Sequence, residues 1–241
     1  MHGATFHQGA IVTVLPTSGG HRREHRSVLA DVEKRALVWM AQRLPLWVNS
    51  DHLTVLGALA MVGAGAAFAA VPFSRWLLAL VPAFLAINWF GDSLDGTVAR
   101  VRNAQRPRYG FYVDHVVDVA NATLLFGGMA FSGIVSPGIA AALLVAYLLL
   151  CAESFLATHT LGVFRISFSG FGPTELRILL SVGALVAIER PIVHPFGLGE
   201  FWLFDVGGLI GAIGMMMVFV ISAVRNTRTL YRAEPLNGGS R

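Results

Sequence analysis

The chain has 241 residues, of which 55% are hydrophobic and only 13% are charged. Soluble domains carry about 25% charged residues, so this composition argues against an ordinary water-soluble protein and favours a lipid environment. The net charge of +4 comes almost wholly from arginine, since Lys34 is the only lysine. Because the arginines lie beside apolar segments, we interpret them as topology and headgroup contacts and expect no nucleic-acid partner.

The N-terminal region divides into two parts. Residues 1–26 are polar and rich in Gly and His, and we expect a flexible tail there. Residues 27–48 differ, because apolar residues recur at a spacing of three or four: Leu29, Val32, Ala36, Leu37 and Met40. With Trp39 and Trp47 near its end, this segment is predicted to be an amphipathic helix lying in the membrane interface.

Six apolar segments follow, at about 53–72, 75–99, 111–133, 137–160, 174–191 and 201–224. Most are near the ~20 residues that cross a ~30 Å hydrocarbon core as a helix. Pro and Gly residues in the connectors mark the expected breaks. The sequence therefore predicts an all-α integral membrane protein with six transmembrane helices, preceded by the interfacial helix. The six-helix domain is expected over residues 49–225, with a C-terminal tail over residues 226–241.

Four aspartates and an arginine lie between two of these apolar segments, with the spacing Asp92-x2-Asp95-Gly96-x2-Ala99-Arg100-x9-Gly110-x3-Asp114-x3-Asp118. An ionised side chain inside a bilayer costs at least ~2.5–3.5 kcal/mol on insertion scales, so such residues are usually functional or paired. Spacings of three and four place each aspartate pair on one face of its helix. Folding back at the basic turn of residues 101–109 brings the two pairs to the same membrane depth, facing one another.

The distribution of arginine predicts the orientation of the protein. If the N-terminus is cytoplasmic, the loops near 100–110 and 160–175 and the C-terminal tail are cytoplasmic too. Sixteen of the 18 Lys and Arg residues then lie on that side, and only Arg75 and Arg190 fall outside. The positive-inside rule therefore predicts that both termini and the aspartates lie at the cytoplasmic side of the membrane.

Converging carboxylates indicate a site for metal ions. Four aspartates at one place cannot all stay ionised without a cation, and hard divalent ions such as Mg²⁺ or Mn²⁺ prefer oxygen ligands. Metal ions with a nearby arginine suit a diphosphate substrate, and a spare carboxylate can take the proton of an attacking alcohol. The residues alone therefore point to phosphoryl or phosphatidyl transfer at the membrane surface.

Intramembrane aspartates also allow other interpretations: a structural role, a transporter or an inactive scaffold. One such residue alone is equally compatible with a hydrogen bond to a neighbouring helix. Buried carboxylates also mark cation or proton transporters, which need acidic residues along a path across the bilayer. Here the four aspartates cluster on one side, with Asp205 as the acid at the far side, which favours an enzyme. A catalytically inactive scaffold of the same fold is disfavoured by the intact set of metal ligands.

The string from Asp92 to Asp118 resembles the signature of the CDP-alcohol phosphotransferase family, membrane enzymes with six spanning helices that are commonly homodimers. All eight fixed positions of the signature are present, and the resemblance covers most of residues 30–225. One departure is the spacer between Arg100 and Gly110, which has nine residues where the family pattern usually has eight. It falls in the basic turn, away from the helix faces.

The resemblance implies a role for each position. Asp92, Asp95 and Asp114 would hold two Mg²⁺ or Mn²⁺ ions with Asp114 bridging, and Asp118, the fourth acidic ligand candidate, would be the general base. The part of the pocket that binds CDP would include Thr54, Asp92, Gly96, Ala99, Arg100 and Gly110. Thr54 belongs to a Pro-Asn-x-x-Thr-like entry to the first span, in which this chain has Ser50 and Asp51 at the first two positions. Asp51 is a candidate cap of that helix.

Family enzymes act on an alcohol with a CDP-linked donor and release CMP, in one of two arrangements that the motif does not separate. We favour transfer of a phosphatidyl group from CDP-diacylglycerol to a small polar alcohol. The alternative is transfer of a phosphocholine- or phosphoethanolamine-type headgroup from a CDP-amino-alcohol to diacylglycerol. Charged residues in the later segments are candidates for the headgroup or acceptor pocket: Glu153, Arg165, Glu175 and Arg177. The expected partners are the donor, the acceptor, membrane lipids and a second copy of the chain.

Overall fold

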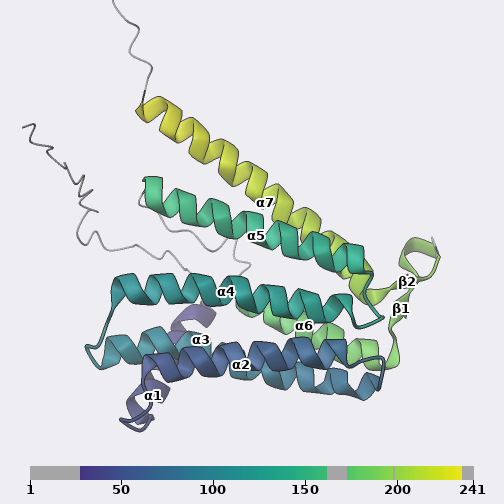
Figure 1. Cartoon of the computed structure of the whole chain (residues 1–241), viewed down its shortest axis with the longest axis horizontal. Coiled ribbons are helices and arrows are strands. Elements are labelled where there is room, and N and C mark those ends of the chain that lie inside the picture. The colour runs from purple at the N-terminus through teal and green to yellow at the C-terminus, as the bar shows by residue number, and fades with distance from the viewer. Residues whose placement is uncertain (1–27, 162–172, 198, 235–241) are drawn as a thin grey trace, which may run out of the picture.

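The computed structural model describes residues 28–161, 173–197 and 199–234, and this part of the chain is mainly helical (Figure 1). The long helices are α1 (Val28–Arg43), α2 (Ser50–Ala69), α3 (Leu80–Val101), α4 (Pro107–Ala130), α5 (Pro137–Leu161), α6 (Pro173–Glu189) and α7 (Leu203–Ala233). The short elements are η1 (Arg75–Ala79), η2 (Pro195–Gly197) and an antiparallel hairpin of β1 (Ile192–Val193) and β2 (Phe201–Trp202). The predicted tail of residues 1–26 lies outside the described residues.

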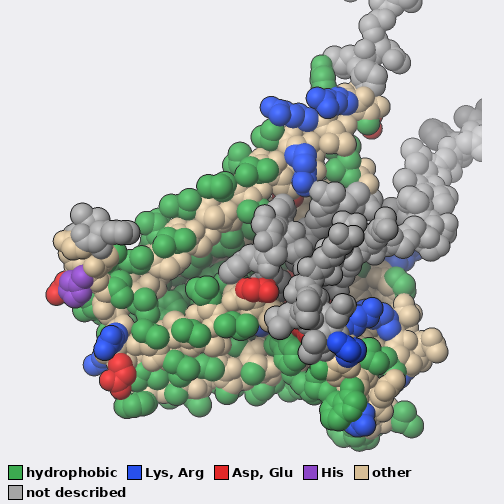
Figure 2. All heavy atoms as spheres, turned by 180° about the vertical axis from the view of Figure 1, so that it is seen from behind, with side chains coloured by type: hydrophobic (Ala, Val, Ile, Leu, Met, Phe, Trp, Pro, Cys, Tyr) green, Lys and Arg blue, Asp and Glu red, His purple; other side chains and the backbone are tan. Residues whose placement is uncertain are grey.

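Four helical stretches are long and apolar enough to cross a membrane: α2, η1 together with α3, α5 and α7. α4 carries Asp114, His115, Asp118 and Asn121, which lower its hydropathy, and α6 has only 17 residues. The prediction of a helical membrane protein is therefore confirmed, whereas the number of six spans stays a prediction. On the part of the face that Figure 2 draws in colour, hydrophobic side chains run along the helices, and most charged side chains lie toward the ends.

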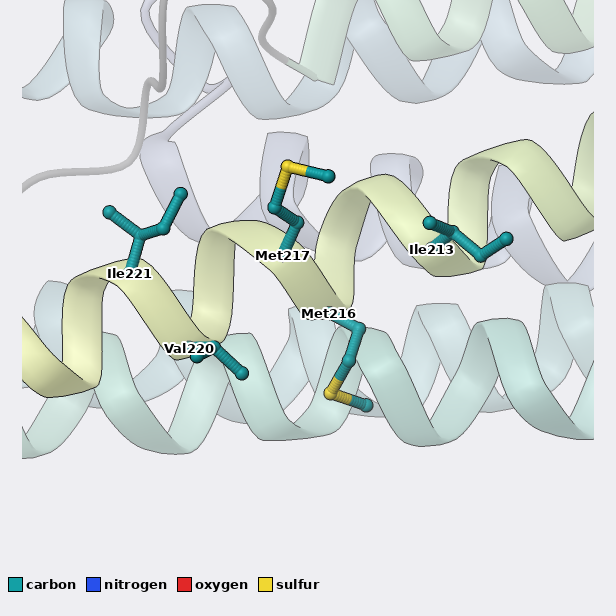
Figure 3. A pocket seen from close by; sticks show the side chains of 5 residues that line it. All are labelled: Ile213, Met216, Met217, Val220 and Ile221. Carbon is teal, nitrogen blue, oxygen red and sulfur yellow. The ribbon is translucent and has the colours of Figure 1, made fainter.

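Exposed apolar side chains are also continuous along α7. Five of them line a shallow hollow on its surface, shown in Figure 3: Ile213, Met216, Met217, Val220 and Ile221. A soluble monomer rarely leaves such a contiguous apolar surface in water, whereas a lipid environment solvates it without cost. This hollow lies on a helix that carries none of the four signature aspartates.

The helix ends and the connections between helices gather at two opposite ends of the molecule. Figure 1 shows α1, the turn between α3 and α4, and the C-terminal ends of α5 and α7 at one end of the molecule, which we call the α1 end. The β1–β2 hairpin and the turn between α4 and α5 lie at the opposite end, the hairpin end. Arg75 begins η1 and Arg190 separates α6 from β1, so both belong to the hairpin end. In the described part of the chain, the two arginines that the sequence sets apart therefore lie at the end opposite α1.

α2 lies against both helices that carry the aspartates, and glycines allow the backbones to approach closely. A Cβ added at Gly91 of α3 would lie 2.5 Å from the carbonyl oxygen of Leu53 in α2. A Cβ added at Gly128 of α4 would lie 2.1 Å from the carbonyl oxygen of Gly65 in α2. Both distances are too short for a real side chain, so these two glycines set how α3 and α4 pack on α2.

Gly127 and Gly128 provide a matched test of this packing. Gly128→Ala forces the backbones of α2 and α4 apart, whereas at Gly127 no described atom lies within 4 Å of an added Cβ. Overpacking of this kind costs about 1–3 kcal/mol, so we expect Gly128→Ala to lower the melting temperature in detergent by about 2–12 °C. Gly127→Ala is expected to leave it unchanged or slightly higher. Equal melting temperatures for the two variants would show that the close contact does not determine stability.

α1 is held against α3 by apolar and polar contacts. Ala41 of α1 is buried with Leu94 and Val98 of α3, and the indole Nε1 of Trp89 donates to Glu33 Oε1 at 3.1 Å. The guanidinium of Arg102 donates to backbone carbonyls of the loop after α1: Leu44 at 2.9 Å, Pro45 at 3.1 Å, Leu46 at 3.4 Å, and Val48. These contacts hold α1 and the loop that leads to α2 against α3. The predicted place of α1 in the membrane interface stays a prediction.

Several boundaries differ from the predictions. α1 ends at Arg43 rather than near residue 48, because the residue before Pro45 is disfavoured in helical conformation. α2 is capped by Asn49, whose Oδ1 accepts from the His52 amide at 3.0 Å, so the candidate role of Asp51 as the cap is wrong. Asp51 instead forms an ion pair with Arg106 of the basic turn. α7 continues to Ala233, beyond the predicted end of the last apolar segment.

Candidate active site

All four signature aspartates line one small pocket between α2, α3 and α4. Its remaining lining comes from the same three helices: Thr54, Gly57, Ala58, Asn88, Val117 and Asn121. Asn88, Asp92 and Asp95 recur at helical spacing on α3, as Asp114, Val117, Asp118 and Asn121 do on α4, so each set forms one face. The structure therefore brings together the two pairs that the sequence places on facing helices.

Asp95 is the buried aspartate of the pocket, since only 7% of its surface is exposed. Its Oδ2 accepts a hydrogen bond from Thr54 Oγ1 at 2.7 Å, and its Oδ1 accepts from the backbone amide of Gly96 at 2.5 Å. Thr54 was predicted as part of the CDP pocket, and the structure places it directly against an aspartate. These donors fix the direction of the Asp95 carboxylate, since a buried acceptor keeps its partners.

Asp92 faces a cation supplied by a different helix. Arg177 of α6 donates from Nη2 to Asp92 Oδ2 at 2.6 Å and from Nε to Asn88 Oδ1 at 2.9 Å. The Asn88 side chain is buried, and its Nδ2 donates in turn to the carbonyl oxygen of Gly57 at 3.0 Å. Sequence reasoning did not single out Asn88. A polar side chain one turn before Asp92 in an apolar segment was the available signal.

The chemistry of the pocket suits a hard divalent cation, although two of its four aspartates contact other side chains. All four aspartates offer carboxylate oxygens, the ligands that Mg²⁺ and Mn²⁺ prefer. Within the described ranges, no three side chains of the His, Cys, Asp and Glu types lie close enough to hold one ion together as they stand. Asp92 contacts Arg177 and Asp95 contacts Thr54, so two of the four carboxylates already have partners within the chain.

The other residues expected around the CDP part lie nearer the α1 end, on α3 and at the start of α4. Arg100 donates from Nη2 to Thr97 Oγ1 at 3.0 Å. A Cβ added at Gly96 would lie 3.3 Å from Arg100 Nη1, so the glycine leaves room for this guanidinium. Ala99 precedes Arg100 on the same helix. Gly110 is in the first turn of α4, where no described atom lies within 4 Å of an added Cβ.

The described candidates for the headgroup or acceptor pocket lie on two helices, α5 and α6. Arg177 lies at the aspartates, as described above. Glu153 of α5 accepts a hydrogen bond from Asn226 Nδ2 of α7 at 2.6 Å, which ties these two neighbouring helices together. Glu175 lies in the first turn of α6. Arg165 lies outside the described residues.

Comparison with protein families identifies the chain. The model of the CDP-alcohol phosphatidyltransferase family matches residues 47–225, which is most of the sequence and includes the whole pocket. The chain belongs to the CDP-alcohol phosphatidyltransferase family. This confirms the resemblance seen in the spacing of the aspartates, and it makes the protein a transferase of membrane phospholipid synthesis. The transporter interpretation finds no support here.

A solved structure also resembles this family member. It is the crystal structure of the Mycobacterium tuberculosis phosphatidylinositol phosphate synthase with CDP-DAG bound. The two chains are 20% identical, with a TM-score of 0.53, and the match covers 86% of this chain and 98% of that chain. At this level of identity the likeness shows a shared fold. Comparison with curated proteins gave no significant match.

Proposed function

We propose that this enzyme transfers a phosphatidyl group from CDP-diacylglycerol to a small polar alcohol and releases CMP, with Mg²⁺ or Mn²⁺ as cofactor. The observation that carries the proposal is the convergence of Asp92, Asp95, Asp114 and Asp118 on one pocket, with Arg177 at Asp92. A structural neighbour with CDP-DAG bound supports this donor. The membrane context of the fold supports a lipid substrate, because the pocket lies between helices with apolar exposed faces.

The aspartates divide into ligands and a base in this proposal. Asp92, Asp95 and Asp114 would hold the divalent ions, and Thr54 orients the Asp95 carboxylate through its hydrogen bond. Ions bound there would neutralise the diphosphate and stabilise the oxygens that exchange in the displacement. Asp118 takes the proton of the acceptor hydroxyl as the hydroxyl oxygen attacks the lipid-linked phosphorus. The bond from that phosphorus to the CMP oxygen then breaks, and CMP leaves.

The residues toward the α1 end are proposed to receive the nucleotide. Gly96 and Ala99 leave space beside the backbone of α3, and Gly110 leaves space at the start of α4. The guanidinium of Arg100 lies next to Gly96, where it supplies positive charge for the CDP phosphates. Glu153, Arg165, Glu175 and Arg177 remain the candidates for contacts with the acceptor or headgroup.

We further propose six spanning helices, with α4 and α6 crossing the membrane beside the four apolar stretches. Both termini and the pocket are assigned to the cytoplasmic side, because the Arg-rich turn between α3 and α4 and the basic end of α7 lie at the α1 end. Exposed Trp39 and Trp47 support a place for α1 in the membrane interface. We also expect a homodimer, as is common in the family.

Identification of the product by mass spectrometry tests the reaction. Purified protein with Mg²⁺ or Mn²⁺ is offered CDP-diacylglycerol with several polar alcohols in one series, and CDP-choline or CDP-ethanolamine with diacylglycerol in the other. We expect a new phospholipid in the first series, and the alcohol found in it identifies the acceptor. A product in the second series alone would replace our proposal by the alternative donor class, which shares the CDP part and therefore the same pocket.

A further inference from the structure

Arg177 is fixed at the pocket by two directed contacts rather than by charge alone. Its Nη2 donates to Asp92 and its Nε to Asn88, at 2.6 Å and 2.9 Å. Asn88 is only 3% exposed and is itself anchored to the backbone of Gly57, so the acceptor for Nε cannot move freely. The guanidinium plane is therefore held in one orientation. The Arg177 side chain is 18% exposed.

The oxygen that accepts from Arg177 belongs to Asp92, a proposed ligand of the divalent ions. A carboxylate oxygen that accepts a charge-assisted hydrogen bond offers less to a second cation. The guanidinium also offsets part of the repulsion among the four carboxylates that line the pocket. Arg177 therefore holds one carboxylate of the pocket in a contact with a cation of the chain itself.

We propose that Arg177 is a tethered counter-cation that competes with the divalent ion for Asp92. It neutralises Asp92 in the arrangement seen here and gives up this carboxylate when an ion binds. The side chain thereby sets the affinity of the pocket for metal and limits binding of an ion before the substrate arrives. This inference rests on the proposed function, since it presumes that Asp92 is a metal ligand.

Direct measurement of Mn²⁺ binding tests the competition without requiring turnover. The full chain in detergent, without donor or acceptor, is titrated with Mn²⁺, and free Mn²⁺ is measured by electron paramagnetic resonance. We expect Arg177→Gln to bind Mn²⁺ about two- to fivefold more tightly than the wild type, within the range that loss of one partly exposed ion pair allows. Arg190→Gln, which removes the same charge at the hairpin end, is expected to leave the Kd unchanged.

Arg177→Lys separates the contact from the charge. Lysine keeps the positive charge but lacks the planar fork that reaches Asp92 and Asn88 together, so we expect an intermediate Kd. A lysine variant equal to the wild type, beside a tighter glutamine variant, would assign the effect to charge alone and overturn the exchange of contacts. An unchanged or weaker Kd in Arg177→Gln would overturn the competition itself.

Release of CMP by the same wild-type sample keeps the two proposals distinguishable. Wild-type protein that releases CMP with Mn²⁺, while Arg177→Gln binds Mn²⁺ no more tightly, would overturn this inference and leave the proposed function standing. Protein that neither binds Mn²⁺ nor releases CMP from either class of donor would overturn both.

Discussion

Asp118→Asn is expected to abolish turnover while leaving binding of the CDP donor intact. Asparagine keeps the size of the side chain and one oxygen, but it cannot accept the proton of the acceptor hydroxyl. General-base catalysis contributes about 10²- to 10⁴-fold, so we expect CMP release to fall by that factor. Binding of the donor, measured by titration calorimetry in the presence of Mn²⁺, should remain within a few-fold of the wild type.

The matched control for Asp118→Asn is Asp205→Asn. Asp205 lies in the first turn of α7, where its Oδ1 accepts from the backbone amide of Ser136 at 2.7 Å. An asparagine can keep that hydrogen bond, so we expect normal CMP release from this variant. Full activity in Asp118→Asn would remove this residue from the role of base. Loss of donor binding together with activity would instead assign it to the group of ligands.

Asp92→Asn is expected to lose metal-dependent binding of the donor altogether. The substitution removes a charged ligand and the partner of Arg177 at the same time. Loss of an outer contact to a metal ligand typically costs 10–100-fold in affinity, and loss of the ligand itself should cost more than about 100-fold. The measurement is titration of the CDP donor with and without Mn²⁺, again with Asp205→Asn beside it. Unaltered Mn²⁺-dependent binding in Asp92→Asn would show that this carboxylate does not hold the ion.

The spacing of the aspartates was the most informative part of the sequence. Intervals of three and four residues place Asp92 with Asp95 and Asp114 with Asp118 on single helix faces, whatever the rest of the chain does. The short turn between α3 and α4 then places these two faces close to each other. The pocket could therefore be predicted from local geometry, and the same residues indicated the family of the chain.

The contacts that complete the pocket depend on packing between segments distant in sequence. Arg177 reaches Asp92 only because α6 lies against α3, and nothing in the local pattern around Arg177 specifies that neighbour. The contact of Asn88 could not be predicted from local sequence either, since it depends on the close approach of α2 at Gly91. Glu153 stays a predicted headgroup contact, and its hydrogen bond with Asn226 depends on the pairing of α5 with α7.

Helix ends were harder to place than helices. Asn49 and Asp51 are both good capping residues, two positions apart, and the sequence alone does not choose between them. The reciprocal contact of Asn49 with His52 decides in favour of Asn49, which leaves Asp51 to pair with Arg106. α7 continues past its apolar part because arginine and threonine side chains do not interrupt a helix that is already formed.

Release of CMP by the purified wild-type protein is the most direct test of the central claim that the aspartate pocket performs metal-dependent transfer from a CDP-linked donor. The protein in detergent is incubated with CDP-diacylglycerol and a set of small polar alcohols, with Mg²⁺ or Mn²⁺ in one sample and with a chelator in the other. We predict CMP release that requires both the metal and an alcohol. Equal release with the chelator, or no release with either class of CDP donor from folded protein, would contradict the account.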